Sequence, residues 1–264
     1  MKLAIVTGAN GALGRAYLNR LINTSCVNSI NCVGISRTNV REKIPGVTYI
    51  ESTDLLDREN VRKKIDRELP LGNSGEVLFV HPVGRFKFEE NQVPEVDHDL
   101  DGIDDEVYKS NVVTFRNVED TLLELAKQQG LVTDFLLCGF GSVSDRYKVP
   151  YWLSYSRSKD ILRQQISGKT RQNGAGPTVK GVFVNVSTVD TYNENTIRPY
   201  ADKTYWLKPD EIVDDSLQVI LGQSRIRNLE MDIFKPMPGF DPEQYYLPDN
   251  VLERWMREMG RVSG

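Results

Sequence analysis

The sequence has few cysteines, no excess of basic residues and no long apolar run. Its three cysteines, Cys26, Cys32 and Cys138, form no Cys-x-x-Cys pair, which argues against a disulfide framework and is typical of a reducing compartment. The formal net charge of −4 gives no reason to expect nucleic acid as a partner. No window approaches the roughly 18–20 apolar residues of a membrane span, and the chain passes directly from Met1-Lys2 into a short apolar stretch rather than a signal peptide. We therefore expect a cytoplasmic protein without a nucleic-acid or membrane partner.

Short apolar runs alternate with helical patterns along the whole chain. The runs expected to form strands cover residues 3–7, 30–35, 47–50, 77–80, 134–138, 179–186 and 229–234. The helical patterns cover residues 15–22, 58–68, 107–129, 152–172 and 209–221. This alternation predicts an α/β, Rossmann-like doubly wound sheet of about seven parallel strands with helices on both faces. The length of 264 residues fits a single domain over residues 1–264.

A glycine-rich turn follows the first apolar run. Its residues are Gly8, Ala9, Asn10, Gly11, Ala12, Leu13 and Gly14, and a helical pattern comes next. Strand, glycine-rich turn and helix form the context in which backbone N–H groups and a helix N-terminus bind a pyrophosphate. The turn therefore predicts a dinucleotide site, and the simpler alternative is a tight turn without a ligand.

The ends of the following strands offer further cofactor contacts. Ser36 and Arg37 end the second strand, where an acidic residue would bind the ribose 2′-hydroxyl of NAD and an arginine suits the 2′-phosphate of NADP. This pattern favours NADP(H), with NAD(H) as the alternative and a solvated loop charge as the simpler explanation of Arg37. Asp54, followed by Leu55, either contacts an adenine amino group or caps the next helix. His81 follows the fourth strand, at the same predicted edge of the sheet.

Tyr155 and Lys159 lie four residues apart in a predicted helix, about 40° apart around its axis, so both can address one small molecule. An isolated tyrosine has a pKa of about 10, and a nearby ammonium lowers that pKa toward the range in which general acid–base catalysis is effective. The simpler explanation is an ordinary helix with two polar residues one turn apart. Ser142, thirteen residues before Tyr155, and Asn111, in the first turns of the preceding helix, favour the catalytic interpretation.

Together these residues resemble the pattern of the short-chain dehydrogenases/reductases, and the resemblance covers nearly all of the chain. The matching residues are Thr7-Gly8 with Gly11 and Gly14, Asp54-Leu55, Asn111, Ser142, and Tyr155 with Lys159. Three stretches depart from the family. The glycine motif is TGxxGxxG, which is more usual in the extended, sugar-nucleotide branch. His81-Pro82-Val83-Gly84 replaces Asn-Asn-Ala-Gly, and Val186-Ser187 replaces Pro-Gly after the sixth strand.

The resemblance implies a hydride exchange between nicotinamide C4 and a carbonyl or alcohol carbon. It implies that Tyr155 is the general acid for reduction and the base for oxidation, that Lys159 holds the nicotinamide ribose and lowers the Tyr155 pKa, and that Ser142 hydrogen-bonds the substrate oxygen. Asn111 would fix a water that links Lys159 to bulk solvent. Ser144 is a rival for the role of Ser142, but its spacing to Tyr155 is two residues short. A small carbonyl or alcohol substrate and a homodimer or homotetramer are expected.

Aromatic residues with polar tips predict the substrate wall. Tyr147, Tyr151 and Trp152 precede the Tyr155 helix, and Tyr192 lies in residues 190–207, which have the length of a mobile lid. The alternative is that half of the aromatic residues belong to the core or to an interface.

Two further segments complete the predictions. Residues 242–259 would cover the pocket or seal a subunit contact. Arg198 could meet an anionic substrate, although such an arginine is more often exposed. The acidic run 97–102 resembles the start of a calcium loop, but its eighth position is Asp104 and its twelfth is Tyr108, not the bidentate glutamate. We expect no metal site and interpret this run as a solvated loop.

Two other functions stay open beside an NADP(H)-dependent oxidoreductase. The TGxxGxxG spacing favours a sugar-nucleotide epimerase or dehydratase, although the chain leaves little room for a nucleotide-sugar domain after residue 190. A catalytically silent NADP(H)-sensing protein would usually lack the tyrosine or the lysine, and both are present here.

Overall fold

The computed structural model describes residues 2–28, 30–69, 71–73, 75–90, 103–131, 134–170, 177–222 and 227–261. Within these residues one parallel sheet has the order β3-β2-β1-β4-β5-β6-β7. The strands are β1 (Lys2–Thr7), β2 (Ile30–Ile35), β3 (Val47–Ile50), β4 (Glu76–His81), β5 (Asp134–Ser142), β6 (Val179–Val186) and β7 (Asn228–Ile233). The strand order reverses between β1 and β4, which pair in parallel. The carboxyl ends of these two strands therefore flank the crevice in which such sheets bind ligands.

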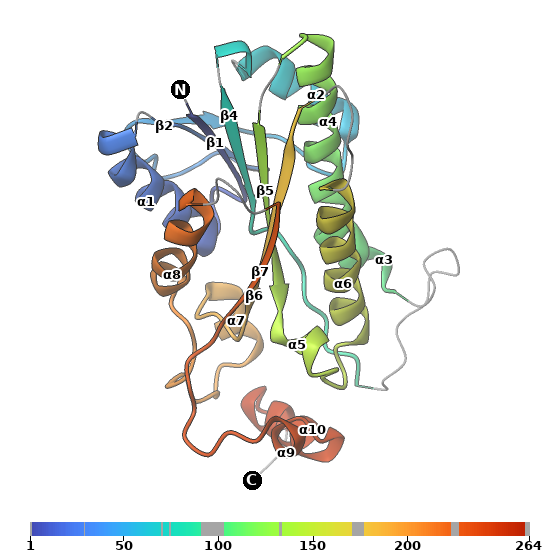
Figure 1. Cartoon of the computed structure of the whole chain (residues 1–264). Coiled ribbons are helices and arrows are strands. Elements are labelled where there is room, and N and C mark those ends of the chain that lie inside the picture. The colour runs from blue at the N-terminus through green and yellow to red at the C-terminus, as the bar shows by residue number, and fades with distance from the viewer. Residues whose placement is uncertain are drawn as a thin grey trace.

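Helices cover both faces of the sheet. They are α1 (Ala12–Asn28), α2 (Arg58–Glu68), α3 (Asp105–Tyr108), α4 (Thr114–Gln128), α5 (Val143–Arg146), α6 (Leu153–Lys169), α7 (Tyr192–Ile197), α8 (Pro209–Gly222), α9 (Pro242–Tyr245) and α10 (Pro248–Glu258). A single 3₁₀ turn, Leu71–Asn73, and a π-helical segment, Lys109–Val113, complete the described elements. Helices α1 and α8 lie on one face, and α2, α4 and α6 lie on the other (Figure 1). No helix in the described ranges is long and apolar enough to cross a membrane.

Two hydrophobic cores hold the layers together. Strands with almost wholly buried side chains separate them, as expected for a parallel sheet covered on both faces. Tyr17 of α1 and Ile212 of α8 belong to the core on one face, and Phe115 of α4 and Leu162 of α6 belong to the core on the other. The predicted doubly wound Rossmann-like fold is confirmed.

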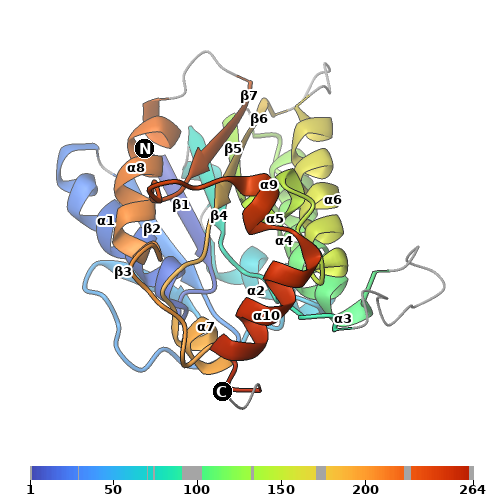
Figure 2. The ribbon, with the colours of Figure 1, turned by 90° about the horizontal axis from the view of Figure 1, so that it is seen from below.

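Four short helices gather at the carboxyl edge of the sheet. Helices α5, α7, α9 and α10 lie below the strand ends in Figure 1, and the view from below shows α10 crossing in front of the sheet (Figure 2). We call residues 190–207 and 242–259 together the cap. The first of these segments contains a helix, α7. Its N-cap residue is Thr191, whose side chain accepts a hydrogen bond from the Glu194 N–H group.

Several predicted elements differ in their bounds. The fifth strand runs on to Ser142 rather than ending at 138, because Gly139 and Gly141 leave room for side chains of α6 and β6. The predicted helix 107–129 is divided into α3, the π-helical segment and α4. The Tyr155 helix begins at Leu153. The acidic run 97–102 lies outside the described residues.

Candidate active site

Three glycines shape the glycine-rich turn. Gly8 has a φ of 64°, which favours glycine. The Gly11 N–H group donates to the Gly8 carbonyl at 2.7 Å. A Cβ atom on Gly14 would lie 2.3 Å from the same carbonyl oxygen. Helix α1 begins at Ala12, and Gly11 and Ala12 are exposed while Leu13 is half-buried. The turn thus presents a helix N-terminus at the carboxyl edge, as the sequence predicted.

The loop after β2 is tied to this turn. The Asn10 side-chain amide donates to Thr38 Oγ1 at 3.0 Å, so it joins the two loops. Ser36 is buried, and its hydroxyl donates to the Thr38 carbonyl. Arg37 is exposed and has no partner among the residues that the structure describes. Of these residues, Arg37 is the one whose side chain is free to meet a ligand.

Asp54 and Leu55 lie between β3 and α2. Asp54 is exposed, and its carboxylate accepts a hydrogen bond from the Leu56 N–H group at 3.0 Å. The cap of α2 is Asp57, whose side chain accepts from Asn60 N, so the alternative that Asp54 caps this helix is wrong. Leu55 is buried, and its carbonyl accepts from Asn117 of α4.

Helix α6 brings the predicted proton-transfer residues together. Lys159 is only 3% exposed, and its Nζ atom lies 5.4 Å from the centroid of the Tyr155 ring. Ser142, at the end of β5, faces the Tyr155 phenol as a hydrogen-bonding partner. Ser144 is fully buried and faces Ser156, with 3.3 Å between the two hydroxyl oxygens. The geometry therefore favours Ser142 over Ser144.

Burial controls the protonation of this pair. It raises the pKa of Tyr155, the carboxylates of Glu194 and Asp145 raise it further, and Ser142 lowers it only in part. Burial lowers the pKa of Lys159 to about 8, against the effect of Asp145, which raises it. Burial is the largest of these effects, and the lowering of the Tyr155 pKa by Lys159 that the resemblance implies stays a prediction. At neutral pH Tyr155 is a neutral phenol and Lys159 is mostly an ammonium.

Asn111 lies in the π-helical segment and clamps the chain beside Lys159. Its amide donates to the Arg85 carbonyl at 2.8 Å and to Ser158 Oγ at 3.0 Å, and its oxygen accepts from the Arg85 N–H group at 3.0 Å. A Cβ atom on Gly84 would lie 2.4 Å from the Asn111 oxygen and 3.0 Å from Lys159 Nζ. The backbone at Gly84, the Asn111 side chain and the lysine therefore meet at one point. Breaks in α-helical geometry of this kind are frequent at functional sites.

The side chain of His81 is not a cofactor contact. It is fully buried, with Nδ1 at 2.8 Å from Thr7 Oγ1 and Nε2 at 3.0 Å from Thr114 Oγ1. Thr114 donates its own proton to the Ser110 carbonyl, so Nε2 carries the imidazole proton and Nδ1 accepts from Thr7. Burial, followed by the charge of Lys159, lowers the pKa of His81 to about 3. This neutral histidine joins β1, β4 and α4, and only its backbone can face a ligand.

The predicted substrate residues have different environments. Tyr147 is 36% exposed and stacks on Tyr246 of the cap with ring centroids 5.3 Å apart. Trp152 is half-buried, and Tyr192 is 83% exposed. Tyr151 is buried against Phe88, so it belongs to the core and its assignment to the substrate wall is wrong.

Phe86 and Phe88 are site residues that the sequence analysis missed. Phe86 meets the Tyr155 ring edge-on with centroids 5.4 Å apart, and it also contacts Trp152 and Trp255. Phe88 stacks on Trp255 at 5.1 Å. The sequence patterns above gave no role to these residues, but two phenylalanines at alternate positions are the signal of an inward-facing stretch.

The cap is locked together by Arg198. This residue is 5% exposed, forms ion pairs with Glu194 and Glu258, and lies over the rings of Trp206 and Trp255 at 4.9 Å and 4.2 Å. It is therefore neither a free anion site nor a solvated side chain.

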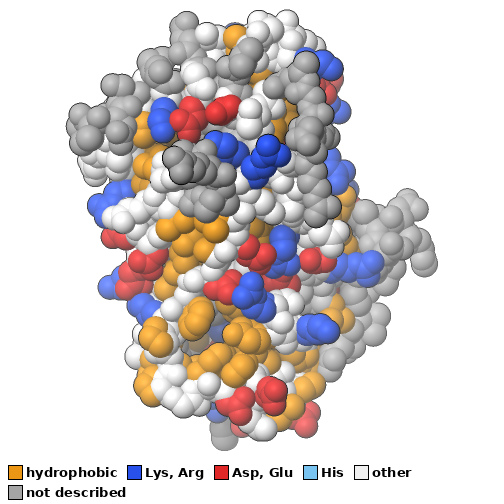
Figure 3. Space-filling view, in the orientation of Figure 1, with side chains coloured by type: hydrophobic (Ala, Val, Ile, Leu, Met, Phe, Trp, Pro, Cys, Tyr) orange, Lys and Arg blue, Asp and Glu red, His pale blue; other side chains and the backbone are white. Residues whose placement is uncertain are grey.

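Hydrophobic side chains, among them Phe234, Leu247 and Tyr147, are exposed in this lower part of the molecule, where Figure 3 shows apolar groups gathered on one face.

Comparison with solved structures agrees with this geometry. An alcohol dehydrogenase from the archaeon Thermococcus sibiricus, complexed with 5-hydroxy-NADP, is 21% identical with a TM-score of 0.66, over 90% of this chain and 99% of that chain. A 4-hydroxyisoleucine dehydrogenase complexed with NADH is 16% identical with a TM-score of 0.61, over 88% and 97%. A variant of actinorhodin polyketide ketoreductase with NADPH is 15% identical with a TM-score of 0.67, over 88% and 95%.

Two further similar structures are named as short chain dehydrogenases, at 14% and 18% identity with TM-scores of 0.66 and 0.65, and the chain has the fold of that family. No family model matches the sequence, and no curated protein matches it. Among the described residues there is also no group of three or more histidine, cysteine or acidic side chains that could hold a metal ion.

The buried neutral His81 predicts a pH dependence of folding. Its pKa is about 3 in the folded protein and about 6.5 in an unfolded chain, so the stability it contributes is full above about pH 6.5 and is lost as the pH falls toward 3. Between pH 7 and pH 5 this residue should lower the free energy of unfolding by about 2 kcal/mol. Urea denaturation of the wild type and of His81→Asn should show the smaller pH dependence in the variant. Equal pH dependence would contradict the assignment.

Replacing Arg198 should release the cap. Arg198→Met leaves Glu194 and Glu258 without their shared cation, and we expect a loss of about 3 kcal/mol in unfolding free energy, as for other broken buried ion pairs. Hydrogen exchange should become faster in α7 and α10 and stay unchanged in β1 and β4. Arg257→Met, which removes an exposed arginine from α10, is the control. Uniform changes across the sheet would contradict a role confined to the cap.

Proposed function

We propose that this protein is an NADP(H)-dependent oxidoreductase that transfers a hydride between a nicotinamide and a carbonyl or alcohol carbon. The observation that carries the proposal is the arrangement of Ser142, Tyr155 and Lys159. The phenol faces the serine, and the buried ammonium lies 5.4 Å from the phenol ring on the same helix. All three stand at the carboxyl edge of the sheet, where ligands bind in this fold.

The residues at this edge fit a dinucleotide. The turn from Gly8 to Gly14 lacks the side chains that would block a close backbone approach. Gly84 brings the backbone close to Lys159 and Asn111, and the Ser187 hydroxyl at the end of β6 is buried without a hydrogen-bond partner among the described residues. Lys159 would hold the nicotinamide ribose, and Gly11 to Leu13 would hold the pyrophosphate. The bound nicotinamide supplies or accepts the hydride.

The chain's own residues then manage the proton. In the reducing direction the neutral phenol of Tyr155 donates its proton to the substrate oxygen, and in the oxidising direction the phenolate accepts one. Ser142 is the hydrogen-bond donor that stabilises charge on the same oxygen. Asn111 holds the backbone beside Lys159 in place, so the ammonium stays next to Tyr155.

Arg37 supports NADP(H) over NAD(H). It is exposed beside the glycine-rich turn and has no partner among the described residues, and a guanidinium suits the 2′-phosphate of NADP. Among the similar structures, two carry an NADP-type cofactor and two carry NADH. NAD(H) is therefore the alternative that the affinity measurement below tests.

Aromatic rings around Tyr155 support a carbonyl substrate with a substantial apolar part. Phe86 and Trp152 lie on one side of the phenol, and Tyr147 with Tyr246 lies at the edge of the cap. The exposed phenol of Tyr192 stands on the same cap. Such a wall suits a partly polar ligand of moderate size. An assembly of two or four chains in the cytoplasm is part of this proposal.

A second candidate function is NADP(H) sensing without chemistry. The observation in its favour is that burial raises the pKa of Tyr155, which makes the phenolate costly. This candidate predicts tight NADPH binding with no turnover on any carbonyl compound, so one experiment separates the two.

The proposed chemistry is tested by NADPH oxidation against a panel of ketones, quinones and keto-sugars. We expect turnover with at least one class, and Tyr155→Phe should lower kcat by about 10²- to 10⁴-fold because the proton donor is lost. NADPH affinity should stay unchanged in the variant. Tyr49→Phe, which removes a phenol from the edge strand β3, is the control. A Tyr155→Phe variant that keeps full activity would refute the mechanism.

The cofactor preference is tested at Arg37. Arg37→Ala should raise the Kd of NADPH about tenfold, the effect of losing one charge-assisted hydrogen bond, and leave the Kd of NADH unchanged. Lys127→Ala removes the same charge from the far end of α4, and it should change neither value. Tighter binding of NADH than of NADPH by the wild type, with no effect of Arg37→Ala, would contradict the preference.

A further inference from the structure

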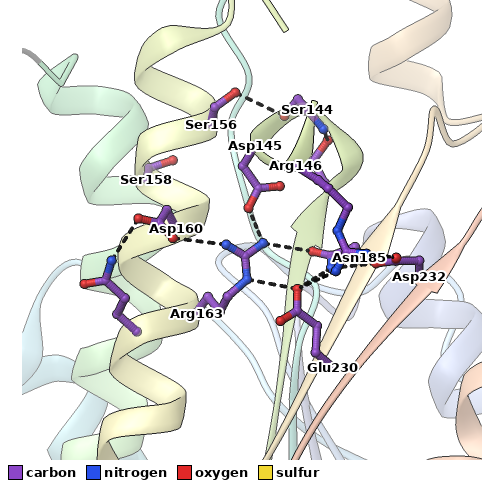
Figure 4. Close-up of polar contacts among 12 residues, drawn as sticks. Ser144, Asp145, Arg146, Ser156, Ser158, Asp160, Arg163, Asn185, Glu230 and Asp232 are labelled. Atoms are coloured by element: carbon purple, nitrogen blue, oxygen red, sulfur yellow. Dashed lines mark hydrogen bonds and ion pairs between the residues drawn. The ribbon is translucent and has the colours of Figure 1, made fainter. Parts of the chain in front are cut away.

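A network of charged side chains lies directly beside the Tyr155–Lys159 pair. Its centre is Arg163 of α6, which forms ion pairs with Asp145 of α5, with Asp160 at 3.0 Å and with Glu230 of β7 at 3.1 Å. Figure 4 shows the guanidinium surrounded by these carboxylates and by Asn185 of β6. One side chain thus joins four elements next to the candidate active site.

One face of helix α6 carries a stripe of three residues, and this face is turned toward the end of β5. Tyr155, Lys159 and Arg163 are spaced by four residues, so they lie on one face of the helix, one turn apart. Ser142 and Asp145, three residues apart at the start of α5, face this stripe: Ser142 faces Tyr155 and Asp145 binds Arg163. Lys159 stands between these two cross-contacts.

Asp145 differs from the other carboxylates of the network by its burial. Its side chain is 5% exposed, whereas Asp160 and Glu230 are 47% and 36% exposed. Its Oδ1 atom is buried without a hydrogen-bond partner among the described residues. Lys159 has no carboxylate within 4.0 Å in the part of the chain that the structure describes, and the Tyr155 ring lies 5.4 Å from its Nζ atom. A buried ammonium without a carboxylate partner and a buried carboxylate with one unpartnered oxygen, whose other oxygen is held by Arg163, therefore lie in the same small region.

The other charged groups around Asp145 and Lys159 do not replace this interaction. Arg146 pairs with Glu230 and with Asp232 at the exposed side of β7. Glu194 pairs with Arg198 in the cap. Burial and then the charge of Lys159 keep His81 neutral. Burial raises the pKa of Asp145, and Arg163 opposes that effect, so the ion pair favours the charged carboxylate.

We propose that Asp145 is a positioning residue which, held by Arg163, keeps the Lys159 ammonium charged and fixes Ser142 opposite Tyr155. This inference rests on the proposed function only for the use of a charged Lys159 in catalysis. The charge on Lys159 can itself be measured without substrate. Asp145 raises the pKa of Lys159, against the larger lowering by burial. This direction fits the position of Asp145, which binds Arg163 one helical turn from Lys159.

The experiment follows Lys159 by NMR in protein labelled with ¹³Cε-lysine, with the Lys159 signal assigned from its absence in Lys159→Met. The wild-type signal should titrate with a midpoint near about 8. In Asp145→Asn the midpoint should fall by about one pH unit, the size expected for one removed charge across a partly buried gap. Asp160→Asn, which takes a carboxylate from the same arginine at an exposed position, should leave the midpoint unchanged.

Asp145→Glu separates charge from packing. It keeps the carboxylate while altering the fit, and it should hold the Lys159 midpoint within about a third of a pH unit of the wild type, because the charge remains nearby. A midpoint unchanged in Asp145→Asn would overturn the proposal. Equal falls in Asp145→Asn and Asp160→Asn would also overturn it, because a general loss of negative charge would then be the cause. Equal falls in the Asn and Glu variants of Asp145 would assign the effect to packing and overturn it as well.

Activity gives an independent readout. If the protein reduces carbonyl compounds, the alkaline limb of its pH–rate profile should move to lower pH in Asp145→Asn and stay in place in Asp160→Asn. A shifted NMR midpoint in a protein without any reductase activity would refute the proposed function and leave this inference intact. Reductase activity with no shift of either readout would support the proposed function and overturn this inference.

Discussion

The buried ammonium of Lys159 is the constraint on which the carboxyl edge of the sheet depends. A charge removed from water is costly unless the protein supplies opposite charge or polar contacts. Here burial lowers the pKa of Lys159 to about 8 rather than abolishing the charge. The ring of Tyr155 lies 5.4 Å from the Lys159 Nζ atom, and the charge of Asp145 raises the Lys159 pKa, so both oppose the cost of burial. Gly84 brings the backbone close to the same ammonium.

The cap is also organised around a buried cation. Arg198 is a second buried cation, and it is held by two carboxylates and two indole rings from segments far apart in the chain. Trp255, one of these rings, also packs on Phe86, which meets Tyr155 edge-on. The C-terminal helix is therefore joined by direct ring contacts to the aromatic surroundings of the candidate proton donor.

Sequence patterns gave the sheet accurately and the side-chain roles less so. Strands β2, β3 and β6 have the predicted bounds because a buried parallel strand is a local, continuous apolar run. The placing of Ser142 opposite Tyr155 was expected from the resemblance to the short-chain dehydrogenases/reductases. The burial of Tyr151 and the ion pair of Arg198 with Glu258 could not be expected in this way, because both depend on α10, which lies 50 or more residues away along the chain.

The π-helical segment explains why α4 begins where it does. Its altered turn lets Asn111 bind both the Arg85 backbone and Ser158 of α6, while Thr114, at the first residue of α4, reaches His81. Sequence periodicity predicted one continuous helix here, since apolar side chains keep their stripe across the break. A regular α-helix would change the angle between these two side chains, and one of the contacts would be lost. The irregular turn thus holds the lysine side of the site and the β1–β4 crevice in fixed relation.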